Sequence, residues 1–193
     1  MKSKASNEYI RLGGILLLIT SVVALLLGFF NSITADVIAS TTEKNKILAM
    51  QSIMPAASSF ELLECDIPEG SPIAQAYGAY DSAGTSVGYC FMLTPKGYGG
   101  QLTIMAGIDT ALSVTGVDIV SHSETPGLGA NADDPKWLSQ FVGKTEGLTV
   151  VKNLPQNNQI QAVTSATITS KAVTGAVDSA LAFAKDLSEK EAK

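Results

Sequence analysis

With 193 residues, the chain has room for one membrane anchor and one domain of ordinary size. Its net charge is −5 and its Lys and Arg residues are scattered, which argues against the basic surface that nucleic-acid binding requires. One histidine, His122, and two cysteines without metal-ligand spacing, Cys65 and Cys90, exclude a multi-His or Cys-rich metal site. We expect both thiols to be buried, while an oxidising compartment would also allow a disulfide between them.

The first predicted element is a transmembrane helix. Residues 12–35 carry no charged side chain, and a helix needs about 20 apolar residues to cross the hydrocarbon core. The charges before it are three cations and one acid: Lys2, Lys4, Arg11 and Glu8. This excess places the N-terminus in the cytoplasm and the later residues outside. A cleaved signal peptide is the alternative, but the apolar run is longer than a usual signal core. We therefore expect residues 1–35 to form a cytoplasmic N-terminus and a retained anchor in the cell membrane, in contact with lipid.

Helical spacing continues over residues 32–54 until Pro55, which predicts a helical stalk over residues 36–58. Five segments of strand character follow, separated by Gly, Pro, Asp and Ser: 60–65, 74–80, 87–93, 102–108 and 114–120. A short helix begins near Pro135, with Trp137, Leu138 and Phe141 on one face, and two brief strands fit residues 148–151 and 160–163. The last helix is predicted over residues 170–187 from its apolar stripe. Strands followed by packed helices indicate an α+β fold with an antiparallel sheet in a domain over residues 59–193.

Three segments could hold a ligand, and each has a plainer interpretation. Residues 164–170, Thr-Ser-Ala-Thr-Ile-Thr-Ser, precede the last helix and either cap it or bind an anion at its N-terminus. Residues 122–130, His-Ser-Glu-Thr-Pro-Gly-Leu-Gly-Ala, form either a structured surface loop or one that lets a ligand approach the backbone. Residues 96–100, Lys-Gly-Tyr-Gly-Gly, form either a plain hairpin loop or a loop whose glycines let an aromatic ring system lie against the backbone.

Taken in order, Gly-Tyr-Gly-Gly, Ser-Glu-Thr-Pro-Gly-Leu-Gly and x-Ala-Thr-x-Thr-Ser resemble the FMN-binding domain family. This family contains the G subunits of Rnf electron-transport complexes and the related C subunits of sodium-pumping NADH:quinone oxidoreductases. The resemblance covers essentially the whole chain, including the single N-terminal span. In the family, the threonine of the Ser/Thr-Gly-Ala-Thr pattern is joined to FMN by a phosphoester, which implies that Thr167 is the acceptor here.

The resemblance implies that ten further residues contact FMN or shape its loop: Tyr98, Gly99, Glu124, Thr125, Gly127, Leu128, Thr164, Ser165, Ala166 and Thr169. It also implies that Glu124 and Thr125 line the flavin and that nearby glycines leave it room. Two positions depart from the pattern. Ser165 stands where the family has Gly, which is unfavourable if this position needs a positive φ. Gln161 stands where the family often has Asp.

The resemblance implies an electron-transfer subunit of an ion-translocating ferredoxin:NAD oxidoreductase complex, relaying electrons through covalent FMN outside the membrane. Its partners would be the other membrane subunits and a flavin transferase. It would be a carrier within a complex rather than an enzyme alone, because no nicotinamide fingerprint is present. One alternative is a stand-alone, membrane-anchored flavinylated domain with a sensing or regulatory role. Another is an anchored interaction domain in which the change at Ser165 has abolished flavin attachment.

Overall fold

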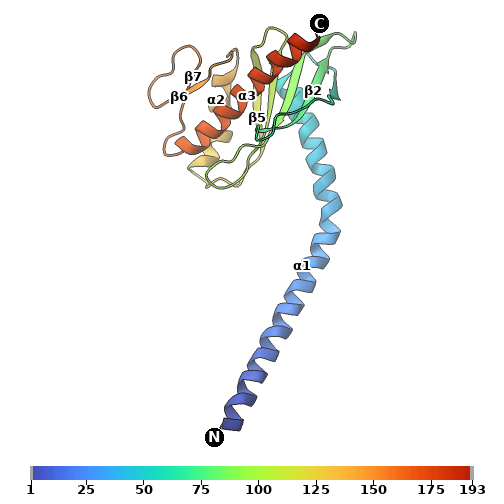
Figure 1. Cartoon of the computed structure of the whole chain (residues 1–193), viewed down its shortest axis with the longest axis vertical. Helices are drawn as coiled ribbons and strands as arrows, with labels where there is room; N and C mark the ends of the chain where they lie inside the picture. The colour runs from blue at the N-terminus through green and yellow to red at the C-terminus, as the bar shows by residue number, and fades with distance from the viewer. Residues whose placement is uncertain (1, 192–193) are drawn as a thin grey trace. The chain divides into compact units, whose positions relative to one another are not determined.

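The computed structural model describes residues 2–191 and divides into two compact units, Met1–Lys44 and Asn45–Lys193. The first helix, α1 (Lys2–Ile53), supplies all the described residues of the first unit and the opening turns of the second. Figure 1 shows α1 as a long helix followed by a folded domain of strands and shorter helices.

The first unit contains a segment suited to a membrane. Residues Arg11–Thr34 span 24 residues with a mean hydropathy of 2.5, which is long and apolar enough to cross a bilayer. Its large apolar side chains are exposed rather than packed against other described residues. The hydroxyls of Thr20, Ser32 and Thr34 donate hydrogen bonds to carbonyl oxygens about one turn earlier in the helix. These three hydroxyls are therefore satisfied within the segment itself.

The second unit is built on a five-stranded antiparallel sheet whose strands follow one another in chain order. The strands are β1 (Ser59–Leu62), β2 (Ile73–Tyr80), β3 (Ser86–Leu93), β4 (Thr103–Asp109) and β5 (Val114–Ser121). The predicted α+β class and antiparallel sheet are confirmed. The first strand is shorter than predicted, ending at Leu62 rather than Cys65.

The remaining elements follow the sheet. They are η1 (Gly129–Asp133), α2 (Pro135–Leu138), η2 (Ser139–Phe141), β6 (Thr149–Val151), β7 (Gln159–Gln161) and α3 (Thr167–Glu191). The Asp134 side chain accepts a hydrogen bond from the Lys136 N–H and caps α2, where Pro135 occupies the first turn. Strands β6 and β7 pair in parallel. The last helix begins at Thr167, three residues before the predicted start at Ser170.

Helix α3 contacts β2, β3 and β4, and the larger core lies on this face of the sheet. Its largest fully buried side chains include Phe91, Leu93, Ile104, Ile108, Phe141, Ile160 and Leu181. Figure 1 shows α3 in red, lying along the sheet. Alternation along the strands therefore sends one set of side chains toward α3.

The opposite face of the sheet packs against the end of α1. Met50, Ile53 and Met54 are buried in a second cluster with Tyr77, Cys90 and Met105. The sequence assigns Met50, Ile53 and Met54 to the predicted stalk, whereas the structure packs all three against the sheet. The boundary between stalk and domain stays a prediction.

The two cysteines lie in different environments. Cys90 belongs to the cluster under α1, whereas Cys65 packs at the margin of the core under α3. Both thiols are free, so the structure contains no disulfide between them. Burial raises the pKa of the Cys90 thiol to about 12, which keeps it protonated and unreactive at neutral pH.

A pair of glycines lets α1 approach the sheet. Gly107 of β4 and Gly116 of β5 face each other across the ladder. A Cβ atom on Gly116 would lie 2.9 Å from the Cα atom of Ile53 and 3.0 Å from its carbonyl oxygen. A larger residue there would collide with the backbone of α1, so the absence of side chains permits the contact.

Candidate functional site

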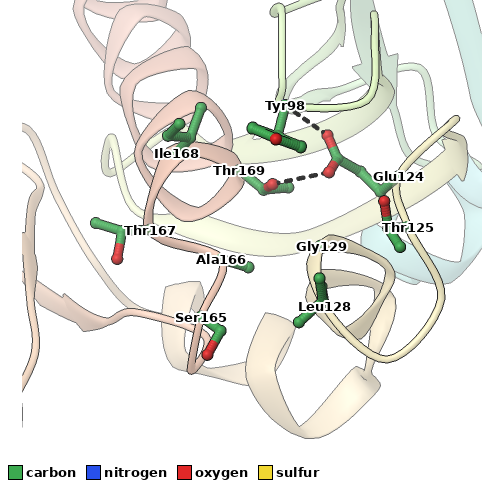
Figure 2. Close-up of a pocket in the computed structure, with 10 residues that line it drawn as sticks. All are labelled: Tyr98, Glu124, Thr125, Leu128, Gly129, Ser165, Ala166, Thr167, Ile168 and Thr169. Carbon is green, nitrogen blue, oxygen red and sulfur yellow. Dashed lines mark hydrogen bonds between the residues drawn. The ribbon is translucent and has the colours of Figure 1, made fainter.

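Three loops that are distant in sequence meet at one end of the α3 face. The first joins β3 to β4 and is closed by a bridge between Lys96 and Gln101. The second follows β5 and leads into η1. The third precedes α3. Figure 2 shows side chains from all three around one hollow. The three motifs singled out in the sequence are thus brought together by the fold.

Glu124 connects the three loops. Its Oε1 atom accepts hydrogen bonds from the backbone N–H groups of Tyr98 at 2.8 Å and Gly99 at 3.1 Å. Its Oε2 atom accepts a hydrogen bond from the Thr169 hydroxyl at 3.0 Å (Figure 2). Glu124 and Thr169 are both buried, at 6% and 0% exposure. Hydrogen bonds to a charged acceptor in such a setting are stronger than neutral ones, so the carboxylate fixes the loops relative to α3.

Glycines make room for this carboxylate. A Cβ atom on Gly97 would collide with Glu124 Oε1, and one on Gly129 would collide with Glu124 Oε2. A Cβ atom on Gly99 would collide with the Ser123 carbonyl oxygen. The resemblance implies that glycines here leave room for the flavin. These contacts show a more immediate role for three of them, which is to let the loops close around Glu124.

His122 contacts both the backbone of the second loop and η1. Its Nδ1 atom accepts a hydrogen bond from the Glu124 N–H at 3.3 Å, and its Nε2 atom lies 4.0 Å from Asp133 Oδ2. Burial raises the pKa of Asp133, and His122 acts in the opposite direction. The single histidine of the chain therefore stabilises the loop by a hydrogen bond. The described residues contain no cluster of metal-binding side chains.

The loop before α3 makes a tight turn. The Ser170 hydroxyl accepts a hydrogen bond from the Val163 N–H at 2.9 Å and donates one to the Ala166 carbonyl at 3.0 Å. Ser165 within this turn has a φ of +63°. The chain then enters α3 at Thr167, so the first N–H groups of the helix, which lack intrahelical partners, are presented at this loop.

The hollow in Figure 2 has a volume of about 410 Å³, and we call it the Tyr98 cavity. Its lining residues are Tyr98, Glu124, Thr125, Leu128, Gly129, Ser165, Ala166, Thr167, Ile168 and Thr169. It includes every residue that the resemblance implies for the site except Gly99, Gly127 and Thr164. Gly129, one of the glycines expected to leave room for the flavin, lines it as well. Ile168 also lines it although it was not among the predicted contacts, and its position beside Thr167 is the one sequence signal for it.

A second hollow, of about 370 Å³, lies next to the first, and we call it the Lys152 hollow. Its lining residues are Lys152, Gln161, Ala162, Val163, Thr164, Ser165 and Thr167. Ser165 and Thr167 line both spaces. Thr164, which is absent from the Tyr98 cavity, therefore lies on the other side of the turn.

The three loops lie within a region that matches a known domain family. Residues 97–182, which carry all three loops, match the family model described as an FMN-binding domain. A crystal structure of the C subunit of a Na⁺-translocating NADH-quinone reductase from Parabacteroides distasonis superposes with a TM-score of 0.50. It is 21% identical and covers 65% of this chain and 74% of that chain, so it shows the fold alone.

Two curated relatives cover more of the chain. The G subunit of the Na⁺-translocating ferredoxin:NAD⁺ oxidoreductase complex of Acetobacterium woodii is 35% identical, over 93% of each chain. The G subunit of an ion-translocating oxidoreductase complex from Methanosarcina acetivorans is 37% identical, over 70% of this chain and 72% of that one. With its N-terminal apolar helix, its sheet and its three converging loops, the chain belongs to the family of G subunits of Rnf-type ion-translocating oxidoreductase complexes.

Proposed function

We propose that this chain is the electron-carrying G subunit of an ion-translocating ferredoxin:NAD⁺ oxidoreductase complex, and that it holds FMN through a phosphoester on Thr167. The flavin, when bound, supplies the redox chemistry, while the protein supplies attachment, orientation and the polarity of the surroundings. The names of the relatives and the match to an FMN-binding domain support the complex and the cofactor.

The position of Thr167 is the observation that carries the proposal. It is half-buried, is the first residue of α3 and lines both the Tyr98 cavity and the Lys152 hollow. The neighbouring threonines have other positions. Thr169 is fully buried and donates its hydroxyl hydrogen to Glu124, whereas Thr164 is exposed and does not line the Tyr98 cavity. Figure 2 shows the Thr167 side chain pointing away from Glu124, while Thr169 points toward it.

The surroundings of Thr167 suit the cofactor. The Tyr98 cavity falls within the range of about 300–1,000 Å³ that is typical of small-molecule sites. Tyr98 and Ile168 are largely exposed at this cavity, and Leu128 partly so, which provides apolar surface for a flat ring system. The N-terminus of α3 favours the negative charge of a phosphate at Thr167.

A covalent link suits a domain outside the cell membrane, because a tethered cofactor cannot be lost by dilution. The N-terminal helix would anchor the domain beside the other membrane subunits, and a flavin transferase would be needed to form the bond. The positive charges before the helix favour this orientation.

The first prediction concerns the acceptor. In full-length chain co-expressed with a flavin transferase, Thr167→Ala should abolish covalent flavin, because no other residue combines the family position with a hydroxyl at the start of α3. In-gel flavin fluorescence of denatured protein measures the adduct, and peptide mass spectrometry locates it on a fragment containing Thr167.

Two variants serve as controls. Thr164→Ala should retain the adduct. Ser165→Ala is the sharper control, because Ser165 is the other hydroxyl residue that lines both spaces. An adduct on Ser165, Thr164 or Thr169, or an undiminished adduct in Thr167→Ala, would contradict the assignment. A wild-type chain that remains without adduct in the presence of the transferase would favour the interaction-domain alternative.

A further inference from the structure

The Tyr98 cavity and the Lys152 hollow differ in charge. Of the described residues that line the Tyr98 cavity, Glu124 alone carries a carboxyl group and none is a cation. The Lys152 hollow has the opposite character, since its one charged lining residue is Lys152 and it contains no carboxylate. Thr167 stands between an anionic and a cationic space.

The fold places Lys152 beside the acceptor loop. Val151, the last residue of β6, pairs with Gln161 of β7, and its carbonyl accepts a hydrogen bond from the Ala162 N–H at 2.8 Å. Lys152 follows immediately, so its backbone lies next to the strand that leads through Thr164 to Thr167. Gln161 lines the same hollow with a neutral carboxamide, and no acid there opposes the charge of Lys152.

We propose that the Lys152 hollow is the anion subsite for the phosphodiester group on Thr167, and that Lys152 is the cation that positions it. This inference rests on the proposed attachment of FMN. A phosphodiester keeps a negative charge, and this charge is more stable beside Lys152 and the first N–H groups of α3 than beside the Glu124 carboxylate. The ring system then takes the opposite direction, into the Tyr98 cavity.

The subsite would bind the phosphorus oxygens both during the attachment reaction and in the finished adduct. In the attachment reaction, the Thr167 oxygen forms a bond to the FMN phosphorus of a flavin dinucleotide. The bond from that phosphorus to the bridging oxygen breaks, adenosine monophosphate leaves, and the hydroxyl proton is released. No electrons are transferred. Lys152 would face the same phosphorus oxygens before and after the exchange.

The test uses the full chain in detergent with a flavin transferase and flavin adenine dinucleotide. Lys152→Gln should form covalent flavin about two- to fivefold more slowly than the wild type, the range expected for an exposed ion pair. Lys152→Arg should restore the rate, because it keeps the charge. Lys190→Gln is the matched control, since Lys190 is an exposed lysine in the last turn of α3, far along the helix from Thr167, and lines neither space. Salt at about 0.5 M should reduce the difference in the rate of flavin attachment between the wild type and Lys152→Gln, because it screens the charge of Lys152.

The phosphorus-31 NMR resonance of the flavin-loaded protein distinguishes two explanations for a slower rate. Either Lys152 faces the phosphodiester in the finished adduct, or Lys152 only contacts the transferase. In Lys152→Gln, this resonance should shift relative to the wild type, and in Lys190→Gln it should not. An unmoved resonance in Lys152→Gln overturns the inference whatever the rate, because it means that Lys152 does not face the phosphodiester. A wild-type chain without any adduct would overturn the proposed attachment itself, whereas an adduct on Thr167 with an unmoved resonance would overturn only the subsite.

Discussion

Ser165 has a backbone conformation that glycine adopts more easily. Its φ of +63° lies in the left-handed region, which costs an L-residue roughly 1–2 kcal/mol because Cβ approaches the carbonyl oxygen. The family pattern has Gly at this position, and the sequence predicts that Ser is unfavourable there if φ is positive. The structure shows that φ is positive. The turn is held despite the strain by the hydrogen bonds of Ser170 on either side of it.

We therefore expect Ser165→Gly to stabilise the domain by about 0.5–1 kcal/mol, since relief of the strain exceeds the added freedom of the unfolded chain. Urea unfolding of the full chain in detergent, followed by the fluorescence of the single tryptophan, Trp137, measures this change. Ser179→Gly is the matched control. Ser179 lies inside α3, so the same replacement there should destabilise by about 0.5 kcal/mol. A loss of stability in Ser165→Gly would mean that the serine hydroxyl contributes more than the strain costs.

At the scale of elements, the contact of α1 with the sheet depends on Gly116. We expect Gly116→Ala to destabilise the second unit by about 1–3 kcal/mol, because the new methyl group would meet the backbone of Ile53, which cannot move as a side chain could. Hydrogen exchange should increase at residues 49–54, while exchange in α3 should change less.

Gly175→Ala provides the control for this change. Gly175 lies on the exposed side of α3, and a Cβ atom added there would meet nothing within 4 Å, so alanine should stabilise by about 0.5–1 kcal/mol. Unchanged stability in Gly116→Ala would show that the end of α1 is not held tightly on the sheet.

Strong periodicity made most elements predictable. The alternating strands, the apolar stripe of α3 and the Pro135 helix start all stand close to their predicted places. The start of α3 was misplaced by three residues, because hydroxyl residues at 164–170 could all serve as caps and only the turn at Ser165 selects among them. The parallel pairing of β6 and β7 had no sequence signal, since strands of three residues depend on their tertiary surroundings.

The site was predictable as a set of motifs, but its internal connections were not. Family resemblance indicated the three loops, whereas nothing in the sequence showed that the Glu124 carboxylate accepts hydrogen bonds from both Tyr98 and Thr169. The sequence also did not predict that a cation lies beside the loop before α3, because Lys152 lies in a stretch without any motif.

At the scale of the whole chain, the orientation in the membrane is open to a direct test. We expect the N-terminus to be cytoplasmic and residues after Thr34 to be outside, because the cations before the uncharged residues 12–35 stay on the cytoplasmic side. Alkaline phosphatase fused after Lys193, which is active only outside the cytoplasm, should be active. A fluorescent protein that matures only in the cytoplasm, fused at the same place, should be dark. The reverse pattern would contradict the orientation and the reason given for a covalent cofactor.

The hydrogen bonds of Glu124 also have a consequence for the order of events during biogenesis. Its donors lie 26, 25 and 45 positions away along the chain. No contiguous peptide around Thr167 contains them, and contacts of such separation form late because the intervening chain must first be ordered. The mature surroundings of Thr167 therefore exist only once β3, β4, β5 and α3 have assembled. If FMN is attached at Thr167 as we propose, the attachment would mark the chains that have completed folding and leave incomplete ones unmarked.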